Sequence, residues 1–478
     1  MTRVLLPALL LAALAVVGCS EAPGPDDYVG PDAGTDPGVD GGGDHDGGVT
    51  PDGDCAPMYS QDLLPEFQLT ISQSEWAALE DEFLNHAQRV MSGLDPKPYH
   101  PTGFRYVANG QSVDVANVMV RLKGNSSWDQ TVAFDTNPKM QFVISFNEID
   151  PGGRFMGVRK VELDMPRTDL TFLKQRLALK AIREMGIPAQ CANSARLVIN
   201  GQYYGLYTNL ERFDKELLQR VYGHDDDNGN LWDGGRIIET NEDSFTWDRL
   251  DAFWHVTTVD ELRQLADLDD SYYEWAAEEM VGDADGYGNG YANFYLYDHP
   301  TRGFIWMPHD LDTSFDADFL TADSSPVFAP SPFRWDRDWD HYRLVMADPA
   351  EYDKFTAALA TVRSKFDPAE LQADLDKWQA QIAASAEADP HRPFSMDMSR
   401  QYTGYSRQYI ADRARTIDTW LSCLRNGGAD ADGDGYDLCH DCDDHRNNVH
   451  QGLIETCDMI DNDCNGKLDD LPMGMVCQ

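Results

Sequence analysis

Three aspartates and one asparagine in the middle of the chain flank two apolar, strand-like segments. Asp285 lies in a glycine-rich stretch, Asn293 begins the first segment, and Asp310 and Asp312 follow the second. A kinase needs an ionised carboxylate to hold the acceptor hydroxyl, and hard oxygen ligands for the magnesium that binds the triphosphate. The order of aspartate, asparagine, hairpin and aspartate therefore predicts a kinase-like active site.

The first residues of the chain have the pattern of a bacterial export signal. Arg3 precedes an apolar run at 4–17 that is too short to span a bilayer as a mature helix. Gly18 and Cys19 complete a lipobox, in which Cys19 becomes the lipidated N-terminus, and Ser20 favours the outer membrane. An ordinary secretory signal cleaved nearby is the alternative. We expect a signal peptide over residues 1–19 and an outer-membrane lipoprotein of the cell envelope, periplasmic or surface-exposed, held to the membrane by its N-terminal lipid only.

Residues 20–54 are mostly Gly, Asp and Pro, and they contain almost no large apolar side chain. Such a segment cannot repay the entropy lost on ordering, which predicts a disordered tether. The formal net charge of the chain is −44. Nucleic acid and anionic lipid surfaces are therefore excluded as partners, because both require a basic surface. Divalent cations and basic proteins are better candidates.

The chain has nine cysteines. With Cys19 used for lipid, an even number remains, which is consistent with disulfides formed in an oxidising compartment. Cys439 and Cys442 have the spacing of one half of a zinc ribbon, but Cys457 and Cys464 lack the spacing of the other half. We therefore expect disulfides rather than zinc.

The predicted elements between residues 55 and 425 favour a two-lobed α+β fold with a helical C-terminal part. Short strands at 117–123 and 139–146 precede a helix at 170–185. A hairpin then joins 195–199 to 202–206 across Asn200-Gly201, a pair typical of a type I′ turn. Three helices are expected in the second half: one over about 352–366, one starting at Asp367-Pro368, and one over about 406–421.

Five blocks of sequence, in the same order, resemble the CotH (spore-coat protein H) kinase family. They are Arg121 to Trp128 (RLKGNSSW), Pro138-Lys139, Asp169 to Gly186, Asn200 to Glu211 (NGQYYGLYTNLE), and Asn293 to Tyr297 with Ile305 to Phe315 (IWMPHDLDTSF). The chain departs from the family pattern at Met140, where a second lysine is usual, at His309, where a tryptophan is usual, and at Asp316, where a glycine is usual. The resemblance implies a two-lobed atypical protein-kinase fold over residues 55–425.

The resemblance also implies a role for each residue of the site. Asp285 would orient the acceptor hydroxyl and accept its proton. Asn293, Asp310 and Asp312 would hold Mg²⁺ (or Mn²⁺) on the phosphates of ATP. A rival interpretation makes the segment containing Asp283, Asp285 and Asn289 a calcium-binding loop, but it lacks the late bidentate acid that such a loop needs.

Lys139, near the start of its strand, is the preferred lysine for contacting the phosphates of ATP. Arg121 and Lys123 are its rivals. A solvated charge at a strand end is the alternative for Lys139, because lysine is common there.

After Arg425 the chain becomes rich in aspartate and cysteine. Asp430, Asp432 and Asp434 alternate before a glycine, and Asp441 follows, close to the spacing of an EF-hand calcium loop. A second segment repeats the pattern with four oxygen-bearing residues, Asp461, Asp463, Asn465 and Asp469. Residues 426–478 resemble the putative metal-binding motif of surface proteins such as MopE. We expect a small, disulfide-rich tail that binds Ca²⁺, with a solvated acidic tail as the alternative.

Two functions follow from these patterns. The first is a secreted, lipid-anchored kinase that transfers phosphate from ATP to Ser or Thr of surface or exported proteins. The second is a catalytically inactive kinase-like domain that serves as a calcium-dependent surface scaffold or adhesin. The intact Asp285, Asn293 and Asp310 favour the first, and an envelope compartment short of ATP favours the second.

Overall fold

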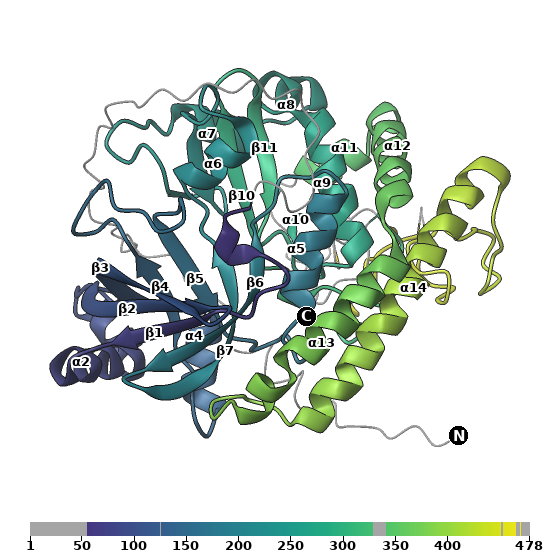
Figure 1. The fold of residues 1–478 in the computed structure, drawn as a ribbon. Helices are drawn as coiled ribbons and strands as arrows, with labels where there is room; N and C mark the ends of the chain where they lie inside the picture. Colours follow the sequence, from purple (N-terminus) through teal and green to yellow (C-terminus); the bar gives the residue numbers. More distant parts are fainter. Residues whose placement is uncertain (1–54, 125, 328–340, 451–452, 465–468, 470–478) are drawn as a thin grey trace.

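The structure is a computed structural model that describes residues 55–124, 126–327, 341–450, 453–464 and 469 of the chain. The predicted signal peptide with Cys19, the predicted tether, and Asn465 of the tail lie outside these residues. Figure 1 shows one part built mainly from strands and another built mainly from helices, with the C-terminal tail beside the last long helix. The predicted α+β class and helical C-terminal part are confirmed.

The strand-rich part is a closed barrel with the strand order β1-β2-β3-β4-β5-β7-β6. Neighbouring strands are antiparallel except β1 and β6, which pair in parallel and close the barrel. Apolar side chains such as Phe67, Leu122 and Phe142 fill the interior. The strands are β1 (Glu66–Thr70), β2 (His100–Ala108), β3 (Gln111–Lys123), β4 (Gln141–Ser145), β5 (Lys160–Asp164), β6 (Ala192–Ile199) and β7 (Gln202–Glu211).

The hairpin predicted at Asn200-Gly201 joins β6 to β7, and Ile199 pairs with Gln202 across it. The φ angles of Asn200 and Gly201 are 52° and 79°. A type I′ turn requires positive φ at both central residues, which asparagine and glycine adopt most easily. This local signal therefore placed the turn and its register correctly.

The second part combines a four-stranded sheet, ordered β11-β10-β8-β9, with most of the helices. Its strands are β8 (Asn230–Asp233), β9 (Ile237–Ile238), β10 (Phe294–His299) and β11 (Gly303–Pro308). The helices of the described chain are η1 (Pro57–Tyr59), α2 (Gln73–Leu84), α3 (His86–Met91), α4 (Ser126–Phe134), α5 (Lys174–Glu184), α6 (Lys215–Tyr222), α7 (Asp248–Trp254), α8 (Val259–Leu265), α9 (Leu268–Val281), α10 (Tyr287–Gly290), η2 (Leu311–Thr313), α11 (His341–Met346), α12 (Pro349–Lys365), α13 (Pro368–Ala388) and α14 (Met396–Asn426).

Helix-capping residues explain why the start of α13 was predicted correctly and the start of α14 was not. Asp367 caps α13 through the backbone amides of Ala369 and Glu370, as expected from Asp367-Pro368. The last helix is longer than predicted, because α14 starts at a cap from Ser395.

Helix α5 starts later than the predicted residue 170. The carboxylate of Asp169 accepts the backbone amides of Thr171 and Lys174, and Phe172 has a φ of 65°. The residues before Lys174 form this turn and not a helix, because a positive φ cannot continue an α-helix. The delayed start matters for the site, since α5 contacts β6 of the barrel, α9 and α13 of the helical part, and the short helix η2.

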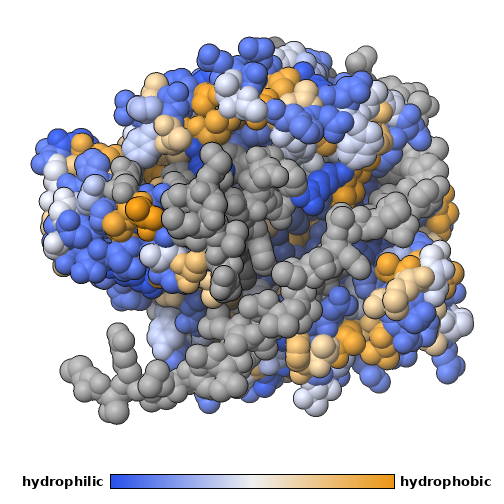
Figure 2. All heavy atoms as spheres, turned by 180° about the vertical axis from the view of Figure 1, so that it is seen from behind, coloured by the Kyte–Doolittle hydropathy of each residue, from blue (hydrophilic) through white to orange (hydrophobic). Residues whose placement is uncertain are grey.

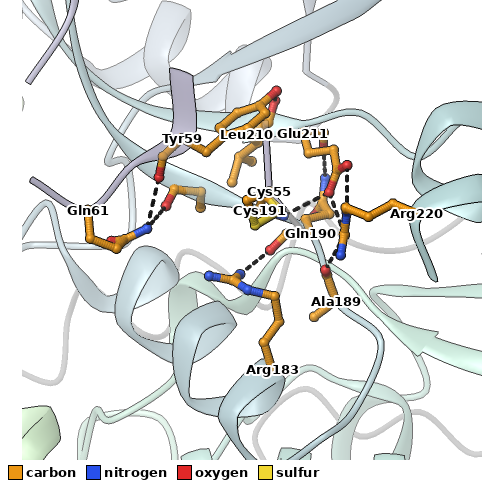
Figure 3. The surroundings of a disulfide bond; sticks show 11 residues. Cys55, Tyr59, Gln61, Arg183, Ala189, Gln190, Cys191, Leu210, Glu211 and Arg220 are labelled. Atoms are coloured by element: carbon orange, nitrogen blue, oxygen red, sulfur yellow. Dashed lines mark hydrogen bonds and ion pairs between the residues drawn. A yellow bond between two sulfur atoms is a disulfide. The ribbon is translucent and has the colours of Figure 1, made fainter. Parts of the chain in front are cut away.

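A disulfide between Cys55 and Cys191 fastens the N-terminal segment to the barrel. Beside it, the Gln61 side chain donates to the carbonyl of Ala192 at 2.7 Å, and the amide of Cys191 donates to the Glu211 carboxylate at 2.9 Å (Figure 3). Glu211 is the last residue of β7, where the chain leaves the barrel. The disulfide therefore fixes the region in which the two parts are connected.

Among the described residues, no helix is long and apolar enough to cross a membrane. On the face opposite to the view of Figure 1, the described residues show hydrophilic side chains mixed with apolar patches (Figure 2).

Lys139 and Asp389 form a buried ion pair of 2.7 Å that joins the barrel to the segment after α13. The Lys139 ammonium also donates to the carbonyl of Leu206, and Asp389 accepts the amide of the same residue. Both side chains are almost fully buried. Removing one partner of such a pair leaves an uncompensated charge in a low-dielectric interior.

We expect Asp389→Ala to lower the free energy of unfolding by about 3–5 kcal/mol, because it leaves the Lys139 ammonium buried without a counter-charge. Denaturant unfolding measures this effect. The control is Asp114→Ala, which removes one partner of the exposed Arg105–Asp114 pair and should barely move the unfolding midpoint. Equal losses in the two variants would show that the buried pair does not hold the two parts together.

Candidate active site and metal-binding tail

The segment that carries Asp285 begins where α9 ends at Gly282. Gly282 has a φ of 66°, and a Cβ atom there would lie 2.0 Å from the Tyr409 hydroxyl. Only glycine fits such a position, so the chain turns sharply and directs the next residues toward β10. Asp285 follows, and Asn293 immediately precedes β10.

Asp310 and Asp312 lie on the other side of the β10–β11 hairpin. Asp310 follows the end of β11, and Asp312 lies in the short helix η2. The φ angles of Asn293 and Asp310 are 50° and 51°, in the left-handed region. Non-glycine residues in this region often cluster at functional sites, where the surrounding structure holds them.

The structure brings the predicted residues together. The side chain of Asn293 hydrogen-bonds Asp285, and the charge of Asp310 acts on both Asp285 and Asp312. Asp312 also accepts a hydrogen bond from Thr168, and Asp310 accepts one from Gln175 at 3.3 Å. The four residues predicted from their order along the chain therefore form one site.

Burial and mutual repulsion shape the electrostatics of this site. Burial raises the pKa of Asp285 to about 6, and the charge of Asp310 adds to the rise. Burial, Asp310 and Asp285 together raise the pKa of Asp312 well above its usual range, although Lys174 opposes this. Buried carboxylates of one sign favour a cation among them. A side-chain amide and carboxylates are also the hard oxygen ligands that suit magnesium, so the residues fit a metal-bound triphosphate.

Lys123 lies on the outer face of the barrel, at the end of β3. Its ammonium contacts Asp164 and is 2.7 Å from Glu162, and Arg212 holds Glu162 from the other side at 2.6 Å. The Gln175 amide on α5 contacts Asp164 at 3.4 Å as well as Asp310. Lys123 is thus connected to the metal-ligand side of the site through two hydrogen-bonded side chains.

The sequence analysis missed four residues of this network: Glu162, Asp164, Gln175 and Arg212. A signal for two of them was present. In β5 the apolar residues Val161 and Leu163 face the barrel interior and alternate with the two acids. Acids that alternate with core residues in a buried strand lie on its other face, where they need charged or hydrogen-bonding partners.

The preference for Lys139 as the phosphate-contacting lysine is corrected by these contacts. Its ammonium is committed to Asp389 and to a backbone carbonyl inside the molecule. Lys123, one of its rivals, pairs with Asp164, and Gln175 contacts both Asp164 and Asp310. The third candidate, Arg121, lies near the ring of Tyr99 and donates to the carbonyl of Leu122.

The three departures from the family pattern are accommodated locally. Met140 is buried in the barrel core. His309 packs against the rings of Phe213 and Tyr295, and Asp316 pairs with Lys174 at 2.8 Å. None of the three replaces a predicted metal ligand.

The tail after α14 is held by disulfides. Cys423 bonds Cys439, Cys442 bonds Cys464, and Cys457 is also disulfide-bonded. The expectation of disulfides rather than zinc is therefore confirmed for these residues. The first of the bonds attaches the tail to α14.

Asp430, Asp432 and Asp434 each bring a carboxylate oxygen within 4.8 Å of the others. Their remaining hydrogen bonds shape the loop, since Asp430 accepts the amides of Gly433 and Gly435. One carboxylate oxygen on Asp432, on Asp434 and on Asp441 is buried without a hydrogen-bond partner. Burial raises the pKa of Asp441 to about 6, and Asp434 and Asp432 add to the rise. These unsatisfied oxygens are what a bound cation would satisfy.

The second acidic group of the tail consists of Glu455, Asp461 and Asp463. Glu455 was not predicted, because it precedes the repeated aspartate pattern. Its carboxylate accepts the amides of Asp463 and Asp469, so it also organises the loop. Asp469 accepts the amides at 458 and 459, which is a turn-stabilising contact.

No curated protein matches the chain. A solved Helicobacter pylori structure, the proinflammatory kinase CtkA, is similar with a TM-score of 0.30 and 9% identity, over 61% of this chain and 93% of that chain. Residues 441–470 match the Cu-binding MopE model, described as a putative metal-binding motif. Residues 120–417, more than half of the chain, match the CotH kinase protein model, and the chain therefore belongs to the CotH kinase family.

Proposed function

We propose that this protein is a secreted, lipid-anchored protein kinase that transfers phosphate from ATP to Ser or Thr of surface or exported proteins. The observation that carries the proposal is the convergence of Asp285, Asn293, Asp310 and Asp312 in one partly buried site. Family membership supports the same activity. The negative charge of the chain favours basic acceptor proteins over nucleic acid.

Each residue of the site has a defined task in this reaction. Asp285 accepts the proton of the acceptor hydroxyl as the acceptor oxygen bonds to the γ-phosphorus and the bond to the leaving ADP oxygen breaks. Asn293, Asp310 and Asp312 hold Mg²⁺ (or Mn²⁺). When bound, this metal neutralises charge on the phosphates. Lys123, fixed by Glu162 and Asp164, is the residue proposed to contact the phosphates.

We also propose that the tail binds Ca²⁺. Its candidate ligands are carboxylates, whereas the sulfurs of Cys423, Cys439, Cys442 and Cys464 are consumed in disulfides. Hard oxygen ligands suit calcium, and copper prefers nitrogen or sulfur. This tail supports the second candidate function, a calcium-dependent surface scaffold or adhesin that keeps the kinase-like domain without its activity.

Residues 4–19 support export and lipidation at Cys19, with an outer-membrane location.

The kinase proposal predicts that the purified protein labels itself or a basic test protein with labelled ATP and magnesium. Asp285→Ala and Asp310→Ala should each lower labelling by about 100-fold or more, because they remove the base and a metal ligand. Lys123→Met should weaken ATP binding in calorimetry. The exposed Asp114→Ala serves as the matched control. If the wild type does not bind ATP, or if the Asp310→Ala variant labels as well as the wild type, the protein is not a kinase.

The calcium proposal predicts opposite effects of Asp441→Asn in the two metal states. A carboxyl whose pKa is raised on folding opposes folding when it is charged, so its stability contribution falls as the pH rises past about 4 to 6. At pH 7 in chelator, the variant tail should therefore resist proteolysis better than the wild type. In millimolar calcium, the wild-type tail should become the more resistant.

Limited proteolysis of the whole protein, followed by reduction and mass spectrometry, measures this protection. The control is Asp397→Asn, whose side chain is 92% exposed on α14 and should respond to neither condition. A wild-type tail that is digested equally fast in calcium and in chelator contradicts calcium binding.

The localisation proposal predicts that Cys19→Ala releases the protein from membranes, because the lipid on Cys19 is the proposed anchor. Fractionation of cells that express the two forms measures release, and mass spectrometry of the wild type measures the acyl chains. A Cys19→Ala protein that stays in the membrane fraction, with no acyl mass on the wild type, would sink the proposal.

A further inference from the structure

The hydroxyl of Thr313 lies between two carboxyl groups of the catalytic segment. Its oxygen is 2.6 Å from an oxygen of Asp283 and 2.7 Å from an oxygen of Asp285. Asp283 and Thr313 are buried, with 0% and 2% of their surfaces exposed. Asp283 and Thr313 are therefore shielded from water, which could otherwise supply or accept protons, whereas Asp285 is partly exposed.

Counting protons limits how these groups can be arranged. A hydroxyl has one hydrogen, so Thr313 can donate to only one of the two carboxyl groups. Two carboxylates that share one site, one of them fully buried, cannot both ionise easily. The other carboxyl group must then carry a proton and donate it to the Thr313 oxygen, since two oxygens at this distance need a hydrogen between them.

The surroundings decide which of the two carries the proton. Asp285 is partly exposed, and contact with water favours its ionised form. Asp283 lies on the inner side, where one of its oxygens has no hydrogen-bond partner. Burial, the charge of Asp285 and the charge of Glu278 raise the pKa of Asp283 well above its usual range, and Asp310 acts in the same direction. The acid deeper in the protein is thus the protonated one.

We infer that Asp283 and Thr313 are positioning residues for the base: the Asp283 carboxylic acid donates to Thr313, and the Thr313 hydroxyl donates to the Asp285 carboxylate. This inference rests on the proposed kinase function and extends it to two residues that touch neither substrate nor metal. It also explains how the segment that carries Asp285 is held next to η2. Thr313 belongs to η2, the same short helix that carries Asp312, so its hydroxyl ties the base to the turn that presents the metal ligands.

The arrangement predicts a loss in turnover rather than in ATP binding. Thr313→Val keeps the shape of the side chain and removes its hydroxyl, so Asp285 loses one of its two donors. We expect kcat to fall on the order of 10- to 100-fold, because small misplacements of a catalytic group have effects of this size. KM for ATP should change by less than about twofold, since the proposed metal ligands are untouched.

Conservative variants separate positioning from general damage to the fold. Thr313→Ser restores a hydroxyl at the same place and should recover most of the activity that Thr313→Val loses. Asp283→Asn keeps a neutral donor of the same shape and should be more active than Asp283→Leu by about 10-fold. If Thr313→Val retains the wild-type kcat, or if Asp283→Asn is no better than Asp283→Leu, the inference is overturned.

A second measurement does not depend on catalysis. Infrared difference spectroscopy at neutral pH distinguishes the carbonyl stretch of a protonated carboxylic acid from the bands of a carboxylate. The wild type minus Asp283→Asn difference should contain one protonated-acid band. The same difference for Asp114→Asn, at an exposed position, should contain only carboxylate bands. A carboxylate signal for Asp283 overturns the inference even if the protein is a kinase, and failure of ATP labelling with the acid band present rejects the proposed function alone.

Discussion

The structure depends on the way in which it accommodates buried negative charge. Burial raises the pKa values of Asp283, Asp285 and Asp312, and the charge of the neighbouring Asp310 adds to each rise. Ionised carboxylates in the protein interior are stable only with cations or several hydrogen-bond donors around them. The hydrogen bonds from Thr168, Gln175, Asn293 and Thr313 meet part of this need. The remainder is the electrostatic basis for binding a metal-bound triphosphate.

The basic residues around the site are already paired with other acids. The site aspartates therefore need a bound cation. Lys174 neutralises Asp316, Lys123 is held by Glu162 and Asp164, and Arg212 bridges Glu162 to Glu239. A pair with good geometry holds its own side chains in a fixed orientation. The first acidic loop of the tail also gathers carboxylates. His450 lies 4.0 Å from Asp434, and Asp430, Asp432 and Asp434 are one another's neighbours. In both places the fold keeps oxygen atoms available to a cation.

The sequence predicted features that depend on local rules. The type I′ turn at Asn200-Gly201 and the cap at Asp367 are set by neighbouring residues, and both were located correctly. Features set by distant contacts were not predictable in this way. The partner of Lys139 is Asp389, far along the chain, so a single strand-end lysine gave no sign of its burial. The start of α5 was misplaced because Asp169 captures amides that a regular helix would use internally. The order of Asp285, Asn293 and Asp310 was informative because each residue lies next to the end of a helix or strand, and the hydrophobic pattern reveals these ends.

Helix α14 contacts both acidic regions, the candidate active site and the first acidic loop of the tail. Near its middle, Arg413 is fully buried and donates to the backbone and side chain of Glu279, while Tyr409 packs against the turn at Gly282. Near its C-terminal end, Cys423 bonds Cys439 of the tail. The same rigid helix therefore supports the segment that leads to Asp285 and carries the covalent attachment of the first acidic loop.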